Sequence, residues 1–208
     1  MAFGKPGRPP EDRLARQTQI YQAVCPLLLQ VGARRLRMQQ AARAACMSVG
    51  GLYHYFPGKQ KLVLHGLQPQ GFQRRCQDFQ RRCGHLAATQ PQRYAEAILD
   101  DLADTVLYAR PAMLAALELG VFQAGVDGLF PVREELAAAL RPVVPAGTPE
   151  PALWALARAL RRVLLGALLD RDLTKPELRT QLWALVDGYT DPAHAPARRP
   201  RLVTTAAQ

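Results

Sequence analysis

Apolar residues recur along this chain with the period of an α-helix, and no segment alternates with the period of two that marks a half-buried strand. Ala, Leu, Arg and Gln dominate and β-branched residues are few, which also favours helices. The first helix is predicted over 13–31 and ends at Gly32. One face of it carries Leu14, Tyr21, Val24, Leu28 and Val31. The pattern predicts an all-α protein.

Proline and glycine divide the rest of the chain into further helices. Pro26 is expected to kink the first helix, and Pro69 and Gly71 are expected to bend or split a long one. Pro111 is expected to separate two others. The predicted helices after the first are 38–45, 49–55, 59–86, 92–109, 111–124, 131–141, 150–170 and 175–188.

The formal net charge of +10 is distributed unevenly. Residues 1–82 carry fourteen Lys and Arg against three acidic residues, whereas residues 83–208 carry thirteen against fourteen. No acidic residue occurs between Asp12 and Asp78. A basic part joined to a neutral part indicates a module that binds a polyanion, nucleic acid above all, attached to one that does not.

Several classes of protein are disfavoured by the sequence. No apolar run reaches the roughly 18–20 uncharged residues of a membrane span, and no signal peptide is recognised, so we expect a cytoplasmic protein that does not enter a membrane. The four cysteines lack CxxC spacing and the four histidines lack metal-ligand spacing, so no disulfide framework, metal site or cofactor is expected. No Ser/His/Asp or Cys/His arrangement and no phosphate loop stands out, which argues against an enzyme.

Residues 32–61 carry the strongest functional signal. The two short helices 38–45 and 49–55, after a longer one, indicate a helix-turn-helix whose second helix enters the major groove of DNA. Ser48 is a good N-cap for that helix, and its first turn presents free N–H groups to phosphates or base edges. Gly50 and Gly51 lack side chains, which allows the backbone to approach DNA closely.

Other contacts to DNA are expected around this turn. Val49 is a candidate for apolar contact with a thymine methyl group, and Tyr53, His54 and Lys59 are candidates for donation to phosphate oxygens. Arg8, in the sequence Gly-Arg-Pro, resembles the core of an AT-hook that lies in a narrow minor groove. The alternative for this arm is a solubilising leader.

The run Ser48–Leu62, SVGGLYHYFPGKQKL, resembles the signature of the tetracycline-repressor (TetR) family of transcriptional regulators. That signature is roughly Ser, any, Gly, any, Leu, Tyr, any, His or Tyr, Phe, then a short turn and Lys. The resemblance covers residues 13–67. It implies phosphate contacts by Tyr53, His54 and Lys59. It also implies positions near the bases for Arg37, Gln39, Val49 and Gly50.

The sequence departs from the family pattern at four places. Leu36-Arg37 stands where the first helix of the motif usually begins with Thr or Ser, and Ala41 replaces a large aliphatic residue. Cys46 occupies the position of the turn glycine, and Val49 that of a polar residue. These differences leave the fold prediction unchanged and affect the DNA sequence that would be recognised.

The C-terminal half predicts an interface. Residues 150–170 are apolar around most of the helix, and 175–188 carries a stripe of apolar residues, which is more apolar surface than one small domain buries. Two such helices from each of two subunits would form a four-helix bundle, as the resemblance also implies. The alternative is packing within one chain. The residues expected at the interface are Trp154, Leu164, Leu165, Leu168, Leu178, Leu182 and Leu185.

These observations divide the chain into four parts: a flexible basic arm (1–12), a DNA-binding domain (13–67), a helical effector-binding and dimerisation domain (68–190) and a disordered tail (191–208). The predicted function is that of a homodimeric repressor that binds a palindromic operator in double-stranded DNA. A hydrophobic small molecule, in a pocket whose residues the sequence does not identify, is expected to release it. The alternative is an architectural protein that binds DNA without sequence specificity and has no ligand pocket.

Two clusters leave further alternatives open. Cys76 and Cys83 share a helix face and suggest either a thiol redox sensor or two buried small residues. Asp100, Asp101 and Asp104 suggest an effector contact, half of a metal site or a solvated helix face.

Overall fold

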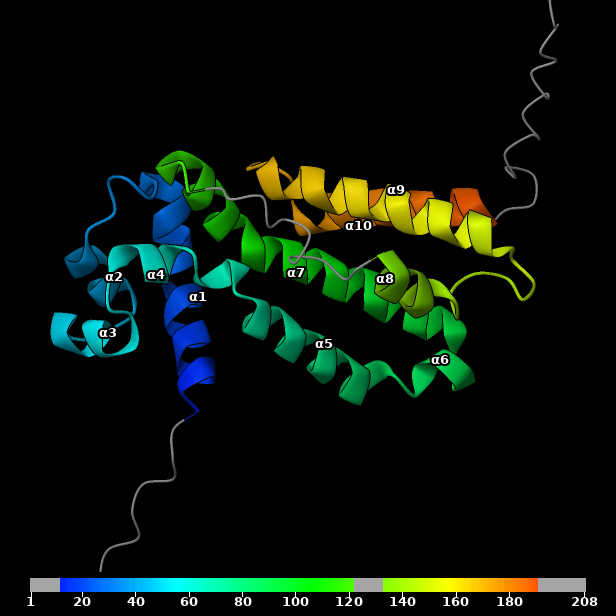
Figure 1. Ribbon diagram of the computed structural model, residues 1–208, viewed down its shortest axis with the longest axis horizontal. Helices are drawn as coiled ribbons and strands as arrows, with labels where there is room; N and C mark the ends of the chain where they lie inside the picture. Colours follow the sequence, from blue (N-terminus) through cyan, green and yellow to red (C-terminus); the bar gives the residue numbers. More distant parts are fainter. Residues whose placement is uncertain (1–11, 122–132, 191–208) are drawn as a thin grey trace, which may run out of the picture.

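The computed structural model describes residues 12–121 and 133–190, which form helices and no strand (Figure 1). The predicted all-α class is therefore confirmed. Expectations for the arm, including Arg8, and for the tail lie outside the described residues. The α-helices are α1 (Arg13–Val31), α2 (Met38–Ala44), α3 (Val49–Tyr55), α4 (Lys59–Val63), α5 (Pro69–Cys83), α6 (Leu86–Thr89), α7 (Pro91–Leu119), α8 (Arg133–Leu140), α9 (Glu150–Leu169) and α10 (Lys175–Thr190), with a 3₁₀ helix η1 (His65–Leu67) after α4.

The first hydrophobic core joins α1, α2, α3 and α4. Leu52 of α3 and Phe56, which follows α3, are buried in this core together with Leu28 of α1 and Leu62 of α4. Ala41 of α2 has no exposed surface. A residue this small lets α2 pack closely on its neighbours, which explains why the core forms without the large aliphatic residue of the family pattern.

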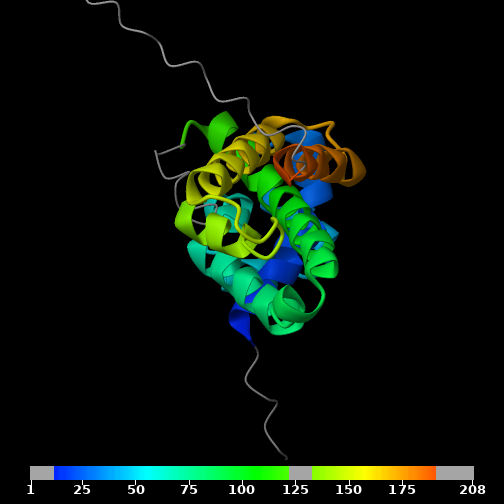
Figure 2. The ribbon, with the colours of Figure 1, turned by 90° about the vertical axis from the view of Figure 1, so that its right-hand side faces the viewer.

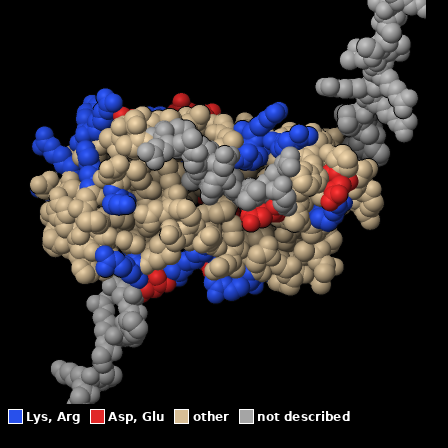
Figure 3. All heavy atoms as spheres, viewed as in Figure 1, with Lys and Arg blue, Asp and Glu red and all other residues tan. Residues whose placement is uncertain are grey.

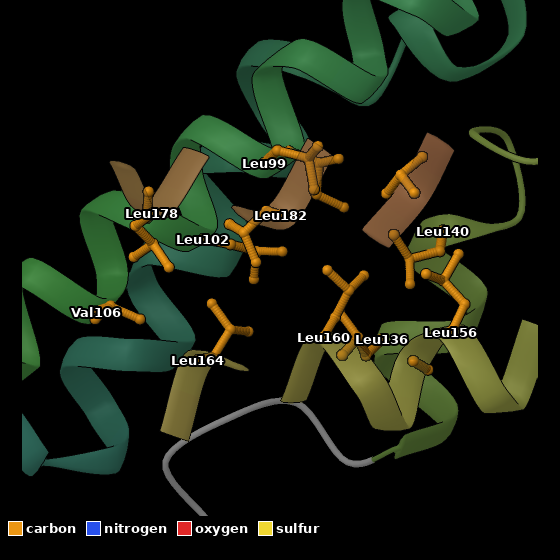
Figure 4. Packing of buried hydrophobic residues seen from close by; sticks show 14 of the residues in the cluster. Leu99, Leu102, Val106, Leu136, Leu140, Leu156, Leu160, Leu164, Leu178 and Leu182 are labelled. Atoms are coloured by element: carbon orange, nitrogen blue, oxygen red, sulfur yellow. The ribbon is translucent and has the colours of Figure 1, made fainter. Parts of the chain in front are cut away.

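The second core surrounds α7, with α9 and α10 on one side of it and α5 and α6 on the other when the molecule is viewed end-on (Figure 2). Its centre consists of leucine and valine side chains from α7, α8, α9 and α10 that point toward one another (Figure 4). Burial of this apolar surface is the main stabilising contribution to this part of the fold.

Four leucines expected at a subunit interface belong to this second core. They are Leu164, Leu168, Leu178 and Leu182, each at most 1% exposed in the single chain. They have no surface left to contribute to a partner, so the interface expectation is wrong for these four. Trp154, Leu165 and Leu185 are only half-buried and retain accessible surface.

The expected break at Pro111 does not occur, because α7 continues from Pro91 to Leu119 with Pro111 inside it. Proline lacks an N–H, so the carbonyl of Leu107 loses its helical partner, at a cost of about 3 kcal/mol. Both faces of α7 are buried near this point, since Ala109, Pro111 and Met113 all lie in the interior. Packing of the long helix against both cores outweighs the lost bond.

The helix predicted over 59–86 is divided near Pro69, as the proline suggested. Gln68 has an extended backbone, and Pro69 begins α5 at a position where its missing N–H costs nothing. A Cβ on Gly66 would lie 2.4 Å from the Tyr21 hydroxyl and 3.0 Å from the Tyr108 carbonyl. η1 is therefore pressed between α1 and α7, and only glycine allows this contact.

The acidic cluster on α7 is paired with basic side chains of two neighbouring helices. Lys175 Nζ lies 2.9 Å from Asp100 Oδ2 and 2.8 Å from Asp104 Oδ1, and Arg82 lies 3.7 Å from Asp101. These pairs connect α10 and α5 to α7. No cluster of three or more potential metal ligands occurs in residues 12–121 and 133–190.

All four cysteines are free thiols. Burial raises the pKa of Cys25 to about 12, and burial followed by the charge of Asp101 raises the pKa of Cys76. Both thiols are therefore protonated at neutral pH, and a protonated thiol is a poor nucleophile. This argues against a redox role for Cys76, which is partly buried. Within the described part of the chain, no helix has the length and apolar character needed to traverse a bilayer.

Candidate nucleic-acid interface

Helix α3 begins at a well-formed cap. Ser48 has an extended backbone, and its hydroxyl oxygen accepts a hydrogen bond of 3.0 Å from the Gly51 N–H. A Cβ on Gly51 would lie 3.1 Å from that oxygen and 3.4 Å from Met47 Cε. Glycine at position 51 therefore leaves room for the Ser48 hydroxyl that caps α3.

Gly50 differs from Gly51, because a Cβ placed on it would meet no atom within 4 Å. Its backbone is helical, and glycine in a helix costs roughly 0.5–1 kcal/mol relative to alanine. Neither packing nor backbone conformation within the described chain accounts for this cost. Gly50 therefore leaves the backbone at the start of α3 accessible from outside the chain.

The opposite end of α3 is held by two side chains of α1. Arg13 Nη2 donates to the His54 carbonyl at 2.7 Å, and Gln17 Nε2 donates to the Tyr55 carbonyl at 2.8 Å. These bonds satisfy carbonyls that lack helical partners and fix the direction of α3. Neither residue was predicted to have this role from the sequence. Their spacing of four, which places them on one face of α1, was the available signal.

The residues predicted to contact phosphates differ in their surroundings. Tyr53 is 47% exposed and His54 is also exposed, so both side chains are accessible. Lys59 is half-buried, and its Nζ donates to the Arg34 carbonyl at 3.0 Å. In this structure Lys59 therefore joins α4 to the turn between α1 and α2.

The remaining predicted residues lie at the start of α2 and of α3. Arg37 and Gln39 are exposed, and the Arg37 N–H donates to Gln40 Oε1 at 3.0 Å, which caps α2. Val49 is half-buried against the first core, whereas Ser48 is exposed. The structure thus brings α2 and α3 together at one end of the molecule (Figure 1).

This end of the molecule is basic. Lys and Arg side chains gather around this end of the molecule in Figure 3, whereas α3 itself carries no Lys, Arg, Asp or Glu. Exposed cations on the first four helices and their turns include Arg34, Arg35, Arg37, Arg43 and Lys61. Such a surface attracts a polyanion over distances of about a Debye length, near 10 Å at 0.1 M salt.

Glu118, near the end of α7, connects the second core to the turn between α1 and α2. Its carboxylate accepts hydrogen bonds from the N–H groups of Ala33 at 2.7 Å and Arg34 at 3.0 Å, and Arg34 Nε donates to the Glu118 carbonyl at 2.8 Å. Partial burial acts to raise the pKa of Glu118, but these backbone N–H groups lower it overall. Gly32, at φ +78°, is required here, since its Cβ would lie 2.9 Å from the carboxylate oxygens.

Comparisons with known proteins agree with this fold. Residues 20–65 match the family of bacterial regulatory proteins of the tetR family. A solved structure that addresses control of antibiotic production by a bacterial hormone is 20% identical, with a TM-score of 0.54 over 84% of this chain and 95% of that one. No curated protein sequence matches the chain.

Two further solved structures are similar at lower TM-scores. FadR of Thermus thermophilus, a TetR-family repressor in complex with lauroyl-CoA, is 18% identical with a TM-score of 0.46, covering 89% of this chain and 97% of that one. A TetR regulator of Rhodococcus sp. RHA1 is 17% identical with a TM-score of 0.39, covering 84% and 94%.

Proposed function

We propose that this chain, a DNA-binding regulator of the TetR family, is a homodimeric repressor that binds a specific operator and leaves it when a hydrophobic small molecule binds. The observation that carries the proposal is Gly50, an exposed helical glycine with open space around it on a basic surface. DNA is the partner that fits, because major-groove binding brings the first turn of such a helix close to bases and phosphates.

The proposed contacts divide into two kinds. Tyr53, His54 and Lys59 bind phosphates and set the position of α3, with Lys59 leaving the Arg34 carbonyl to do so. Val49 and Gln39 lie near base edges and select the sequence. Because phosphates are the same in every sequence, only the second kind distinguishes an operator from bulk DNA.

The proposed dimer forms through the outer faces of α9 and α10. On α9, Leu169 is 53% exposed and Leu165 is half-buried. On α10, Leu185 is half-buried and Ala184 is exposed. To bind successive major grooves, a two-fold axis through these faces has to place the two α3 helices about 34–36 Å apart.

Release by a ligand requires a connection between the second core and α3. Glu118 supplies one, because it extends from α7 and holds the backbone of the turn before α2. A hydrophobic molecule that enters the core beside α7 and displaces this helix would move that turn. The ligand would thereby favour a state in which the two α3 helices no longer fit successive grooves.

The test is a comparison of affinities. Fluorescence anisotropy with the DNA upstream of the protein's own gene should give binding about 10³-fold or more tighter than a scrambled duplex at the same salt concentration. A ratio near one would support the architectural alternative instead.

Oligomeric state is tested separately by sedimentation. Leu169→Arg should produce monomers and weaken operator binding, whereas Leu117→Arg, at a leucine 47% exposed near the end of α7, should leave a dimer. A dimer that persists in Leu169→Arg would place the interface elsewhere.

A further inference from the structure

A cavity of about 360 Å³ opens between α1, α5 and α7. Because α1 belongs to the first core, α5 to the second and α7 to both, the cavity lies where the two cores meet. Its volume falls in the range of roughly 300–1,000 Å³ that small-molecule sites occupy. The lining residues are Gln22, Cys25, Arg75, Asp104, Leu107 and Tyr108.

One wall of the cavity is cationic. Arg75 Nε donates to Thr105 Oγ1 at 3.3 Å, and its guanidinium carbon lies 5.4 Å from the centre of the Tyr108 ring. These contacts hold the guanidinium in place, while its two terminal nitrogens make no hydrogen bond to any residue in the described ranges. A fixed guanidinium with free terminal nitrogens is suited to binding a carboxylate.

The other wall is anionic. Asp104 uses one oxygen, Oδ1, to pair with Lys175 at 2.8 Å, and its side chain is 45% exposed. A simple anion in the cavity would be repelled by Asp104, and a simple cation by Arg75. A molecule that carries both charges is attracted by both walls.

Three less polar residues complete the lining of the cavity. Leu107 and the Tyr108 ring line it from α7, and Cys25 lines it from α1. The Cys25 thiol is neutral, since burial raises its pKa to about 12. A ligand that fills this space therefore needs an apolar group beside its two charges.

We propose that this cavity binds a free α-amino acid with an apolar side chain. Its carboxylate pairs with Arg75, its ammonium group with Asp104, and its side chain lies against Leu107 and Tyr108. The site is distinct from the hydrophobic effector proposed above, because α1 of the DNA-binding part lines it directly. A ligand in this cavity contacts both cores and can therefore change the affinity for DNA. DNA would then change the affinity for the ligand by the same factor.

The proposal is tested by calorimetric titration of the full chain without DNA, using L-phenylalanine, L-leucine and L-methionine. At least one should bind saturably. Removing one charge from that ligand should weaken binding at least tenfold, as measured with the matching acid and amine, for phenylalanine 3-phenylpropanoate and phenethylamine. Absence of saturable binding by all three amino acids, or equal binding of the single-charge analogues, would overturn the proposal.

Variants locate the site. Gln22 is exposed on α1, so Gln22→Trp should fill the cavity without disturbing either core and should weaken binding at least tenfold. Arg75→Gln should do the same, whereas Arg81→Gln, at an exposed arginine of the same helix that pairs with Asp78, should bind like the unmodified chain. Unchanged binding by a folded Gln22→Trp would show that the site lies elsewhere. Because no DNA is present, the result is independent of the proposed operator.

Discussion

Replacing Gly50 with alanine separates the fold of α3 from its contact with DNA. The added Cβ meets no atom within 4 Å, so it introduces no clash within the protein. Alanine in place of glycine in a helix should raise the free energy of unfolding by roughly 0.5–1 kcal/mol. In a chain of this size, each kcal/mol corresponds to a rise in Tm of about 2–4 °C.

The same methyl group should weaken DNA binding. It would stand between the backbone of α3 and the groove and hold the helix away by about the length of a C–C bond, ~1.5 Å. Loss of one charge-assisted contact to a phosphate corresponds to about 1.5–3 kcal/mol, or tenfold or more in affinity. Stability and DNA affinity should therefore change in opposite directions.

Gly51→Ala provides the matched comparison. Its Cβ would lie 3.1 Å from the hydroxyl oxygen of Ser48 and should disturb the cap of α3, which contributes about 1 kcal/mol. This loss should offset the stability gained by replacing glycine with alanine in the helix. Thermal unfolding and fluorescence anisotropy at one salt concentration measure both effects. If Gly50→Ala binds DNA as tightly as the unmodified chain, or is less stable than it, Gly50 does not mark a close approach of DNA to α3.

Four further predictions follow from single contacts. Cys46 adopts φ +52°, a left-handed conformation that costs roughly 1–2 kcal/mol for a residue with a side chain, so Cys46→Gly should raise Tm in thermal unfolding. Glu118→Gln leaves one acceptor oxygen for the N–H groups of Ala33 and Arg34, which now bind one oxygen each. It should lower the free energy of unfolding by about 1–2 kcal/mol in urea titrations. Burial lowers the pKa of His65 below its usual 6.5. The contribution of neutral His65 to stability should therefore be complete above pH 6.5 and decline as pH falls through the folded-state pKa. In urea titrations, His65→Gln should make the free energy of unfolding depend less on pH between pH 7 and 5. Lys59→Ala should weaken binding to all DNA sequences and reduce the slope of log affinity against log salt by about one; an unchanged slope would exclude Lys59 from phosphate contact.

The helix-turn-helix was predictable in detail because its signals are local. Gly32 ends α1 through its own positive φ, and Ser48 begins α3 through a bond to an N–H three residues away. The bounds predicted for α1 and α3 match those observed. The basic surface was equally predictable, since no acidic residue lies between Asp12 and Asp78.

Contacts between distant segments were not predictable from the sequence. Gln17 holds the end of α3 from 38 residues away, and Glu118 holds the backbone of Arg34 from 84 residues away. Lys59 donates to the Arg34 carbonyl, 25 residues away, a contact that the sequence does not indicate. Each of these pairings depends on how the cores place the helices, which no pattern along the chain specifies.

The sequence by itself determined which helix faces are apolar, where local caps begin and end the short helices, and where positive charge concentrates. Only the tertiary structure decided what covers each apolar face. Leu164 and Leu182 look the same in sequence whether they face their own chain or a second copy, and burial in the single chain settles the question. Pro111 remains helical for the same reason, because the packing that compensates for its missing hydrogen bond comes from residues far along the chain.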